Sequence, residues 1–338
     1  MAALAAANAA KTTPVKHLLT GTIPALITPF KRTSAEQDPA TFALDCEAVK
    51  PIVDHMVQQK CGGLYICGTT GEGFVMTAEE RRAMAAASVE AAAGRVPVCV
   101  HVGACPRDQA VALAAHAKSV GADAVASVVP GWETDRREND LGVVTEFFRD
   151  IAAAAAPLPF YVYWFACAFK PGEASRASSF TPAEWVASMN TIPTFAGLKF
   201  TDINMYTFEQ IIAHGGPKLN CLTGPDEMKI CGMVMGSHGA IGSTYNVQLP
   251  TFVAMDEAFA RGDIAAAMAA QRRANAVIAL LLRVCKCSEF GGSAIAAGIK
   301  CILRLRGLPA GYSRNHAPQL SAEQEQELER EMGRLGEL

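Results

Sequence analysis

Lys199 is the residue in this chain best placed for covalent chemistry. It directly follows the apolar segment 194–198, which is typical of a buried strand, and precedes the polar stretch 201–204. An amine at the mouth of an apolar interior is poorly solvated as an ammonium ion, which favours its neutral, nucleophilic form. Such a lysine can attack a ketone. The alternative is a strand-end lysine whose charged group reaches water, because most lysines are exposed.

Two tyrosines precede Lys199 in the apolar run Pro-Phe-Tyr-Val-Tyr-Trp at 159–164. Strand alternation places Tyr161 and Tyr163 on the same face. If that face points into a barrel, a phenol there can relay protons within a dry site. The alternative interpretation is aromatic packing in the core.

A glycine-rich motif, Gly-Thr-Thr-Gly-Glu-Gly at 68–73, follows another apolar run. Thr69 and Thr70 offer two N–H groups and two hydroxyls beside the start of a helix, which suits a carboxylate or a phosphate. The glycine spacing differs from that of the dinucleotide fingerprint. A plain glycine-rich turn is the alternative.

Polar side chains also follow two later strand candidates. Gly224, Asp226 and Glu227 lie in Thr-Gly-Pro-Asp-Glu at 223–227, and Ser243 lies in Gly-Ser-Thr-Tyr-Asn at 242–246. The carboxylates can accept hydrogen bonds from a polyol, or they can be acidic residues favoured at a helix N-terminus. His101 has no second histidine at ligand spacing, so we predict a hydrogen-bonded core histidine.

Eight apolar runs are predicted to be strands. They are 23–26, 63–67, 96–102, 122–128, 159–163, 194–199, 219–223 and 239–243, with helical segments such as 77–93 and 107–120 between them. Thr77 and Glu80 have the spacing of a capping box. Eight β-then-α units predict an α/β fold, a parallel (β/α)8 TIM barrel, with an open doubly wound sheet as the alternative.

Three regions are expected along the chain. Residues 1–20 are predicted to be a disordered, alanine-rich tail, 21–249 the catalytic barrel, and 250–338 a C-terminal helical extension. The alanine-rich start faintly resembles a transit peptide, but arginine is absent before Arg32. A Pro/Gly/Ser-rich insertion at 170–181 follows the fifth strand.

Composition excludes several classes of protein. Half of the 338 residues are hydrophobic and the net charge is −3, so we expect a globular protein with no basic surface for nucleic acid. The apolar run 276–282 is far shorter than the roughly 20 residues of a membrane span. Eleven scattered cysteines without zinc spacing predict free core thiols in a reducing compartment, the cytoplasm, and no metal site.

These motifs together resemble the pyruvate-dependent class I aldolase family that contains dihydrodipicolinate synthase and N-acetylneuraminate lyase. The likeness runs from about Gly21 into the helical extension. It is strongest to the lyases at Gly-Leu-Lys-Phe-Thr-Asp (197–202), Gly-Thr-Thr-Gly-Glu-Gly (68–73), His-Val-Gly-Ala (101–104) and Gly-Ser-Thr-Tyr-Asn (242–246).

The resemblance implies a role for each residue singled out above. Lys199 would form an imine with a 2-keto acid, so that no cofactor is needed, and Tyr163 would move the proton of the sugar hydroxyl. Thr69 and Thr70 would hold the carboxylate. The sugar portion would contact five positions, Thr201, Gly224, Asp226, Glu227 and Ser243. The resemblance also implies a homotetramer.

The subfamily is indicated by one difference. Dihydrodipicolinate synthases carry an arginine five residues after the tyrosine, where this chain has Ala168, so a dicarboxylic product would lose its bidentate partner. N-acetylneuraminate cleavage is therefore the leading hypothesis. The alternative is another pyruvate aldolase or hydratase, which would act on a 2-keto-3-deoxy sugar acid or be of the dihydrodipicolinate synthase type. A non-catalytic barrel that binds a keto acid is the third hypothesis.

Trp164 and the insertion at 170–181 are expected to shape the sugar pocket.

Overall fold

Eight parallel strands form the centre of the protein. The structure, a computed structural model, describes residues 17–34, 37–128, 141–165, 180–287, 295–314 and 319–338. The strands are β1 (Gly21–Pro24), β4 (Leu64–Ile66), β5 (Val98–His101), β6 (Ala124–Val128), β7 (Phe160–Phe165), β8 (Phe195–Thr201), β9 (Asn220–Thr223) and β10 (Gly239–Gly242). Each pairs with its sequence neighbour, β1 pairs with β10, and a parallel bridge from Ala25 to Tyr65 closes the ring.

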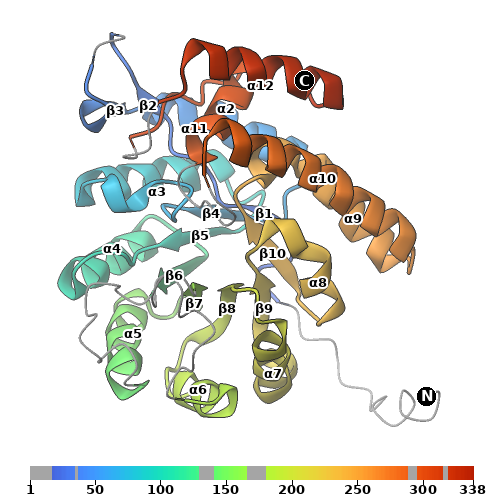
Figure 1. Cartoon of the computed structure of the whole chain (residues 1–338). Coiled ribbons are helices and arrows are strands. Elements are labelled where there is room, and N and C mark those ends of the chain that lie inside the picture. Colours follow the sequence, from blue (N-terminus) through green and yellow to red (C-terminus); the bar gives the residue numbers. More distant parts are fainter. Residues whose placement is uncertain (1–16, 35–36, 129–140, 166–179, 288–294, 315–318) are drawn as a thin grey trace.

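A helix follows each barrel strand and covers its outer face (Figure 1). These helices are α2 (Cys46–Gln58), α3 (Ala78–Ala92), α4 (Arg107–Ser119), α5 (Leu141–Ala155), α6 (Pro182–Met189), α7 (Met205–Gly215), α8 (Lys229–Val234) and α9 (Tyr245–Ala260). The capping box predicted for α3 is present, because the Thr77 hydroxyl accepts from the Glu80 N–H and the Glu80 carboxylate accepts from the Thr77 N–H. The (β/α)8 barrel is confirmed, and the ring closure excludes the open sheet.

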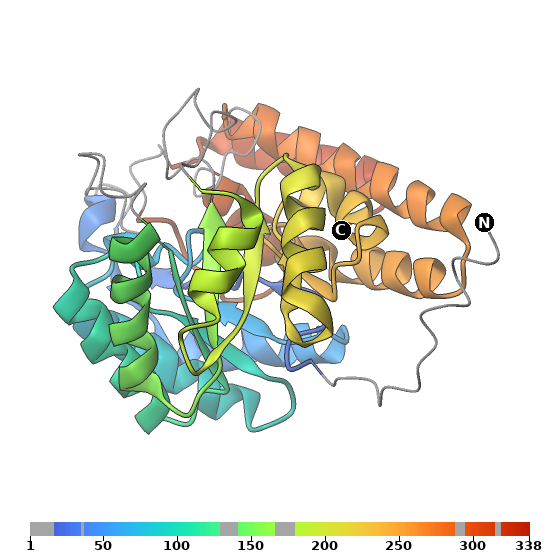
Figure 2. The ribbon, with the colours of Figure 1, turned by 90° about the horizontal axis from the view of Figure 1, so that it is seen from below.

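Three further helices form the C-terminal extension: α10 (Ile264–Val284), α11 (Ala296–Leu305) and α12 (Ala322–Leu335). They lie together against one side of the barrel (Figure 2). The boundary expected at 249/250 falls inside α9, which is the eighth helix of the barrel. A short antiparallel pair, β2 (Phe30–Lys31) and β3 (Ala43–Leu44), was not predicted. Within the described residues, no helix is long and apolar enough to cross a membrane.

The packed part of the chain begins nearer the N-terminus than expected. Residues 1–16 of the predicted tail lie outside the described residues, but Leu19 is fully buried. Its N–H donates to Asn220 Oδ1, and Asn220 Nδ2 donates back to the Leu19 carbonyl. The Tyr161 hydroxyl donates to the same Asn220 oxygen. The packed part of the chain therefore includes Leu19, inside the segment that was expected to be a tail.

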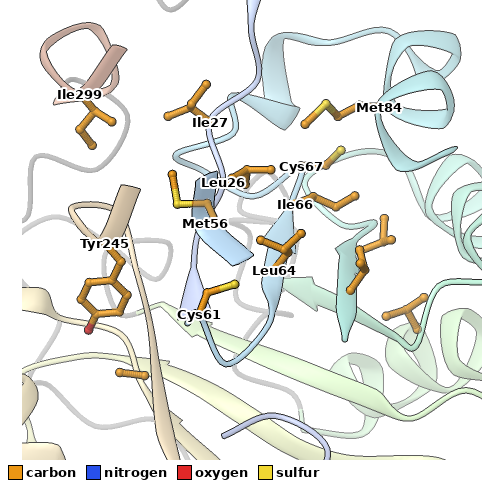
Figure 3. Packing of buried hydrophobic residues seen from close by; sticks show 14 of the residues in the cluster. Leu26, Ile27, Met56, Cys61, Leu64, Ile66, Cys67, Met84, Tyr245 and Ile299 are labelled. Carbon is orange, nitrogen blue, oxygen red and sulfur yellow. The ribbon is translucent and has the colours of Figure 1, made fainter. Parts of the chain in front are cut away.

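The core has two parts. One cluster fills the barrel interior and contains Leu19, Ile23, Ala25, Tyr65, Cys99, Ala124, Ala126, Tyr161, Leu222 and Ile241. The larger cluster includes Leu64 and Ile66 of β4, Met56 of α2, Met84 of α3 and Ile299 of α11 (Figure 3). Cys67, Cys99 and Cys221 are buried, as strand cysteines were predicted to be.

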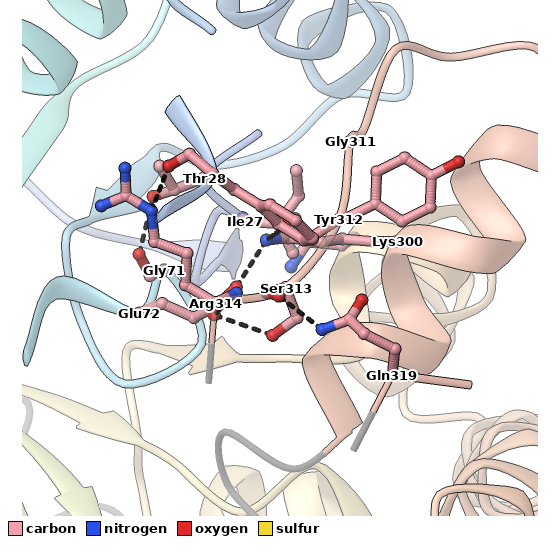
Figure 4. A network of polar contacts seen from close by, with 12 residues as sticks. Ile27, Thr28, Gly71, Glu72, Lys300, Gly311, Tyr312, Ser313, Arg314 and Gln319 are labelled. Carbon is pink, nitrogen blue, oxygen red and sulfur yellow. Dashed lines mark hydrogen bonds and ion pairs between the residues drawn. The ribbon is translucent and has the colours of Figure 1, made fainter. Parts of the chain in front are cut away.

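A buried polar network ties the extension to the loop after β4 (Figure 4). Glu72 and Lys300 are fully buried, and their charged groups lie 2.5 Å apart. Ser313 Oγ and the Arg314 N–H also donate to the Glu72 carboxylate, at 2.7 and 2.8 Å. Glu72 has a φ of 54°, in the left-handed region, so these contacts hold the 68–73 loop in a conformation that few non-glycine residues adopt.

Replacing Lys300 by methionine is expected to lower the free energy of unfolding by about 3–5 kcal/mol, because the Glu72 carboxylate would stay buried without its cation. Urea denaturation measures the change. The matched control is Lys50→Met, which breaks the exposed Lys50–Asp54 pair and should cost at most about 1 kcal/mol. Equal losses in the two variants would contradict this role for Lys300.

Candidate active site

A pocket opens where the barrel strands end, at the side expected of a catalytic barrel. It is lined by Thr69, Thr70, Tyr163, Phe165, Lys199, Thr201, Gly224, Pro225, Asp226, Glu227, Ser243, Thr244, Leu282 and Ile295. All nine of the site residues predicted from the sequence are in this set. They come from β7, β8 and the loops that follow β4, β9 and β10, so closure of the barrel brings them together.

Lys199 and Tyr163 occupy paired positions on neighbouring strands. In the register between β7 and β8, Tyr163 lies opposite Lys199. The Lys199 Nζ atom is 4.2 Å from the centre of the Tyr163 ring and 4.9 Å from that of Tyr65. Lys199 is only 6% exposed, and no carboxylate of the described chain forms an ion pair with it. The amine therefore faces aromatic rings rather than bulk water.

Aromatic rings also surround Tyr163. The centres of the Tyr65, His101 and Phe165 rings lie 6.2, 5.9 and 5.5 Å from that of Tyr163. His101 has both nitrogens occupied, because Nδ1 lies 3.2 Å from the Cys67 carbonyl and Nε2 accepts from the Val128 N–H. Burial lowers the pKa of His101 to about 3. The prediction of a hydrogen-bonded core histidine is confirmed.

The loop with Thr69 and Thr70 lies against the end of β10. The hydroxyls of Thr70 and Ser243 are 2.6 Å apart, which joins the two loops. A β-carbon on Gly73 would lie 2.0 Å from the Cys67 carbonyl oxygen, so the loop can fold back on its strand only with glycine there. This geometry presents small polar groups to the pocket next to Lys199.

Asp226 and Thr201 bring polar atoms without partners to the pocket. Asp226 is 5% exposed, and its Oδ2 accepts from the N–H and the hydroxyl of Thr244, both at 2.7 Å. Its Oδ1 and the Thr201 hydroxyl have no hydrogen-bond partner within the described residues. Burial raises the pKa of Asp226, and the Thr244 hydrogen bonds oppose this shift. A hydroxylated ligand could satisfy both free atoms.

Helix α10 fixes the backbone of this part of the pocket. Gln271 Nε2 donates to the Asp226 carbonyl at 2.9 Å, and Asn275 Nδ2 donates to the Glu227 carbonyl at 3.1 Å. Gln271 is itself buried. Asp226 is thus hydrogen-bonded to Thr244 through its side chain and to the extension through its main chain. The alternative interpretation, an acidic residue that only favours a helix N-terminus, does not account for these contacts.

The expectation that Trp164 shapes the pocket is wrong. Alternation along β7 sends Tyr163 and Phe165 inward and Trp164 outward. The Trp164 indole stacks on Phe200 and meets the Trp185 ring edge-on, and its Nε1 donates to Asp202 at 3.4 Å. Phe165 lines the pocket instead. Ala168 and nearly all of the 170–181 insertion lie outside the described residues.

Five lining residues were missed: Phe165, Pro225, Thr244, Leu282 and Ile295. Phe165 could have been found by extending the alternation of Tyr161 and Tyr163 by two positions. Leu282 and Ile295 belong to the extension, and nothing in their local sequence distinguishes them from other apolar residues there.

A closed (β/α)8 barrel with a buried lysine and tyrosine at its strand ends belongs to the class of barrel enzymes that act from that face. Residues 18–334 match the dihydrodipicolinate synthetase family, and the chain belongs to this family. N-acetylneuraminate lyases of Rhizobium meliloti (strain 1021) and Mus musculus are each 32% identical to it, over 88% of this chain and 88% and 87% of theirs.

Solved structures agree with this assignment. The N-acetylneuraminate lyase of Proteus mirabilis is 26% identical, with a TM-score of 0.82 over 95% of this chain and 100% of that one. The lyase of Aliivibrio salmonicida is 29% identical, with a TM-score of 0.80 over 96% and 99%. The resemblance inferred from the motifs is confirmed.

Gly242→Ala should disturb the Asp226 wall, because the new β-carbon would lie 1.7 Å from Asp226 Oδ1. We expect a loss of about 1–3 kcal/mol in the free energy of unfolding, measured by thermal unfolding. Gly333→Ala is the matched control, since Gly333 lies in α12 with open space around it, and it should gain up to about 1 kcal/mol. A Gly242→Ala protein as stable as the unmodified chain would refute this packing.

Proposed function

We propose that this protein is a Schiff-base-forming class I aldolase that reversibly cleaves N-acetylneuraminate to N-acetylmannosamine and pyruvate. The observation that carries the proposal is the Lys199 amine, which is buried, lies 4.2 Å from the centre of the Tyr163 ring and lines the pocket at the strand ends. The names of the relatives and of the structural neighbours support this substrate.

The chemistry begins at the Lys199 amine. Its lone pair attacks the ketone carbon of the keto acid, water leaves, and a protonated imine remains. The bond between the first and second carbons beyond the ketone, on the side away from the carboxylate, then breaks, and its electron pair moves into the imine to give an enamine; the second of these carbons carries a hydroxyl. The Tyr163 phenol group carries the proton of the neighbouring hydroxyl away, so that this carbon leaves as an aldehyde. Protonation of the enamine and hydrolysis release pyruvate.

The pocket residues divide between the two ends of the substrate. Thr69 and Thr70 hold the carboxylate through N–H and hydroxyl groups, which also orients the ketone toward Lys199. Thr201, Gly224, Asp226, Glu227 and Ser243 face the polyol. An acidic wall suits an uncharged, hydroxylated tail and disfavours a second carboxylate.

The imine itself accepts the electrons of the breaking bond, so the proposed reaction requires no pyridoxal group and no metal ion. As the family resemblance implies, we also propose a homotetramer. The free, largely buried cysteines support a reducing compartment, the cytoplasm. Sedimentation of the purified chain measures the assembly independently of activity.

Substrate turnover tests the proposed function. The purified protein is given N-acetylneuraminate and, separately, a 2-keto-3-deoxy sugar acid, and pyruvate release is followed with a coupled dehydrogenase. We expect a higher kcat/KM for N-acetylneuraminate, because the Asp226 wall matches its long polyol. Cleavage of the shorter acid alone would favour the alternative aldolase, and release of pyruvate from neither would support a binding barrel.

Tyr163→Phe is the matched variant in this experiment. It keeps the ring that packs beside Lys199 and removes only the hydroxyl, so the protein should fold normally while kcat falls by about 10²–10⁴-fold. An unchanged kcat would show that another group carries the proton.

A further inference from the structure

A second aromatic ring faces the Lys199 amine, and it belongs to Tyr65 of β4. The Lys199 Nζ atom lies over the Tyr65 ring, 4.9 Å from its centre, and over the Tyr163 ring, 4.2 Å from its centre. The two rings meet edge to face, with their centres 6.2 Å apart and their planes at 78°. The amine is therefore placed between two aromatic rings that stand nearly perpendicular to each other.

Tyr65 differs from Tyr163 in its access to the substrate. Only 1% of Tyr65 is exposed, whereas Tyr163 lines the pocket. The Tyr65 hydroxyl is buried and has no hydrogen-bond partner in the part of the chain that the structure describes. Burial raises the pKa of Tyr65 well above the ordinary value for a phenol, so its ring is uncharged. Tyr65 can therefore influence the reaction only through the groups packed on its ring, and the amine over that ring is Lys199.

The backbone and a neighbouring glycine hold the Tyr65 ring in this place. The Tyr65 carbonyl accepts from the Leu26 N–H at 2.8 Å, and Tyr65 pairs with Ala25 in the bridge that closes the barrel. A β-carbon on Gly68 would lie 2.7 Å from Tyr65 Cε1, so a side chain at that position would displace the ring. Barrel closure and this glycine thus set the position of the ring over Lys199.

The proposed reaction creates a positive charge at the atom that these rings surround. The nitrogen of the protonated imine is Lys199 Nζ, and it holds its charge until the breaking bond delivers electrons. Lys199 is only 6% exposed, so little water can solvate that charge. The negative face of an aromatic ring attracts a cation, and the attraction is stronger where water is excluded. The two ring faces are therefore positioned to stabilise the imine.

Other titratable groups also act on Lys199. Burial raises the pKa of the Cys99 thiol and lowers that of His101 to about 3, so both of these β5 side chains are neutral. The Asp226 carboxylate acts on Lys199 electrostatically, but no ion pair joins the two within the described residues. Its Oδ2 already accepts two hydrogen bonds from Thr244. The rings are thus the groups that lie directly over the nitrogen.

We propose that Tyr65 is a positioning residue that stabilises the protonated imine on Lys199 through the face of its ring, without touching the substrate. This inference rests on the imine chemistry of the proposed function, but it does not depend on which sugar is cleaved. Tyr163 supports the same cation with its ring and also moves a proton with its hydroxyl, whereas Tyr65 has only the first of these roles.

Fluorination of the ring tests the inference, because it weakens the negative face and keeps the shape of the ring. Tyr65→Phe, which removes only the unpartnered hydroxyl, is the reference. Phenylalanines with increasing numbers of ring fluorines, up to the fully fluorinated ring, are then incorporated at position 65. Each protein is loaded with pyruvate labelled with ¹³C at the ketone carbon, and NMR follows the pH at which the imine on Lys199 loses its proton.

We expect that pH to fall stepwise, by about one unit with the fully fluorinated ring, which is a tenfold loss of proton affinity. Tyr65→Phe should stay close to the unmodified protein. The matched control is the fully fluorinated ring at position 148. Phe148 of α5 is fully buried against Phe147 and Phe160, so this replacement should leave the titration of the imine unchanged.

The outcomes separate this inference from the proposed function. An imine that forms in the unmodified protein but loses its proton at the same pH in every variant overturns the role of Tyr65 and leaves the proposed function intact. An equal shift with the fluorinated ring at position 148 also overturns that role, because the effect would then come from packing. A shift confined to position 65 supports the inference even if the protein cleaves another sugar acid, whereas the absence of any imine would refute both.

Discussion

The pairing of β7 with β8 is the constraint on which the site depends. This register sets Tyr163 opposite Lys199, and barrel closure turns both inward among the rings of Tyr65 and His101. A slip of one residue would send Lys199 to the outer face, because strand side chains alternate. In the proposed mechanism, proton transfer and imine formation both require this one alignment.

The C-terminal extension completes the site. Lys300 of α11 binds Glu72 in the loop that carries Thr69 and Thr70, and Gln271 of α10 hydrogen-bonds the backbone of Asp226. These pocket loops are thus held by helices distant in sequence, whereas Lys199 and Tyr163 are held by the barrel strands. In the proposed mechanism, rigid support of this kind keeps the carboxylate-binding and polyol-binding groups at a fixed separation.

Sequence patterns predicted the elements whose signals are local. The eight strands were recognisable as apolar runs, and the pocket residues as small polar groups at their ends. Other features depend on contacts between distant segments, which no local pattern encodes: the Glu72–Lys300 pair joins residues 228 positions apart. The boundary expected at 249/250 falls inside α9, because Pro250 lies within this helix and Gln248 has non-helical angles, so the regular helical pattern of the sequence begins only after them.

The mechanism's central claim is an imine between Lys199 and a 2-keto acid. The most direct measurement is reduction with borohydride in the presence of pyruvate, followed by digestion and mass spectrometry of the peptides. The mechanism predicts a reduced pyruvate adduct on Lys199, with the buried Lys229 and Lys300 unmodified. A folded protein without an adduct on Lys199, or with the adduct on another lysine, would contradict it.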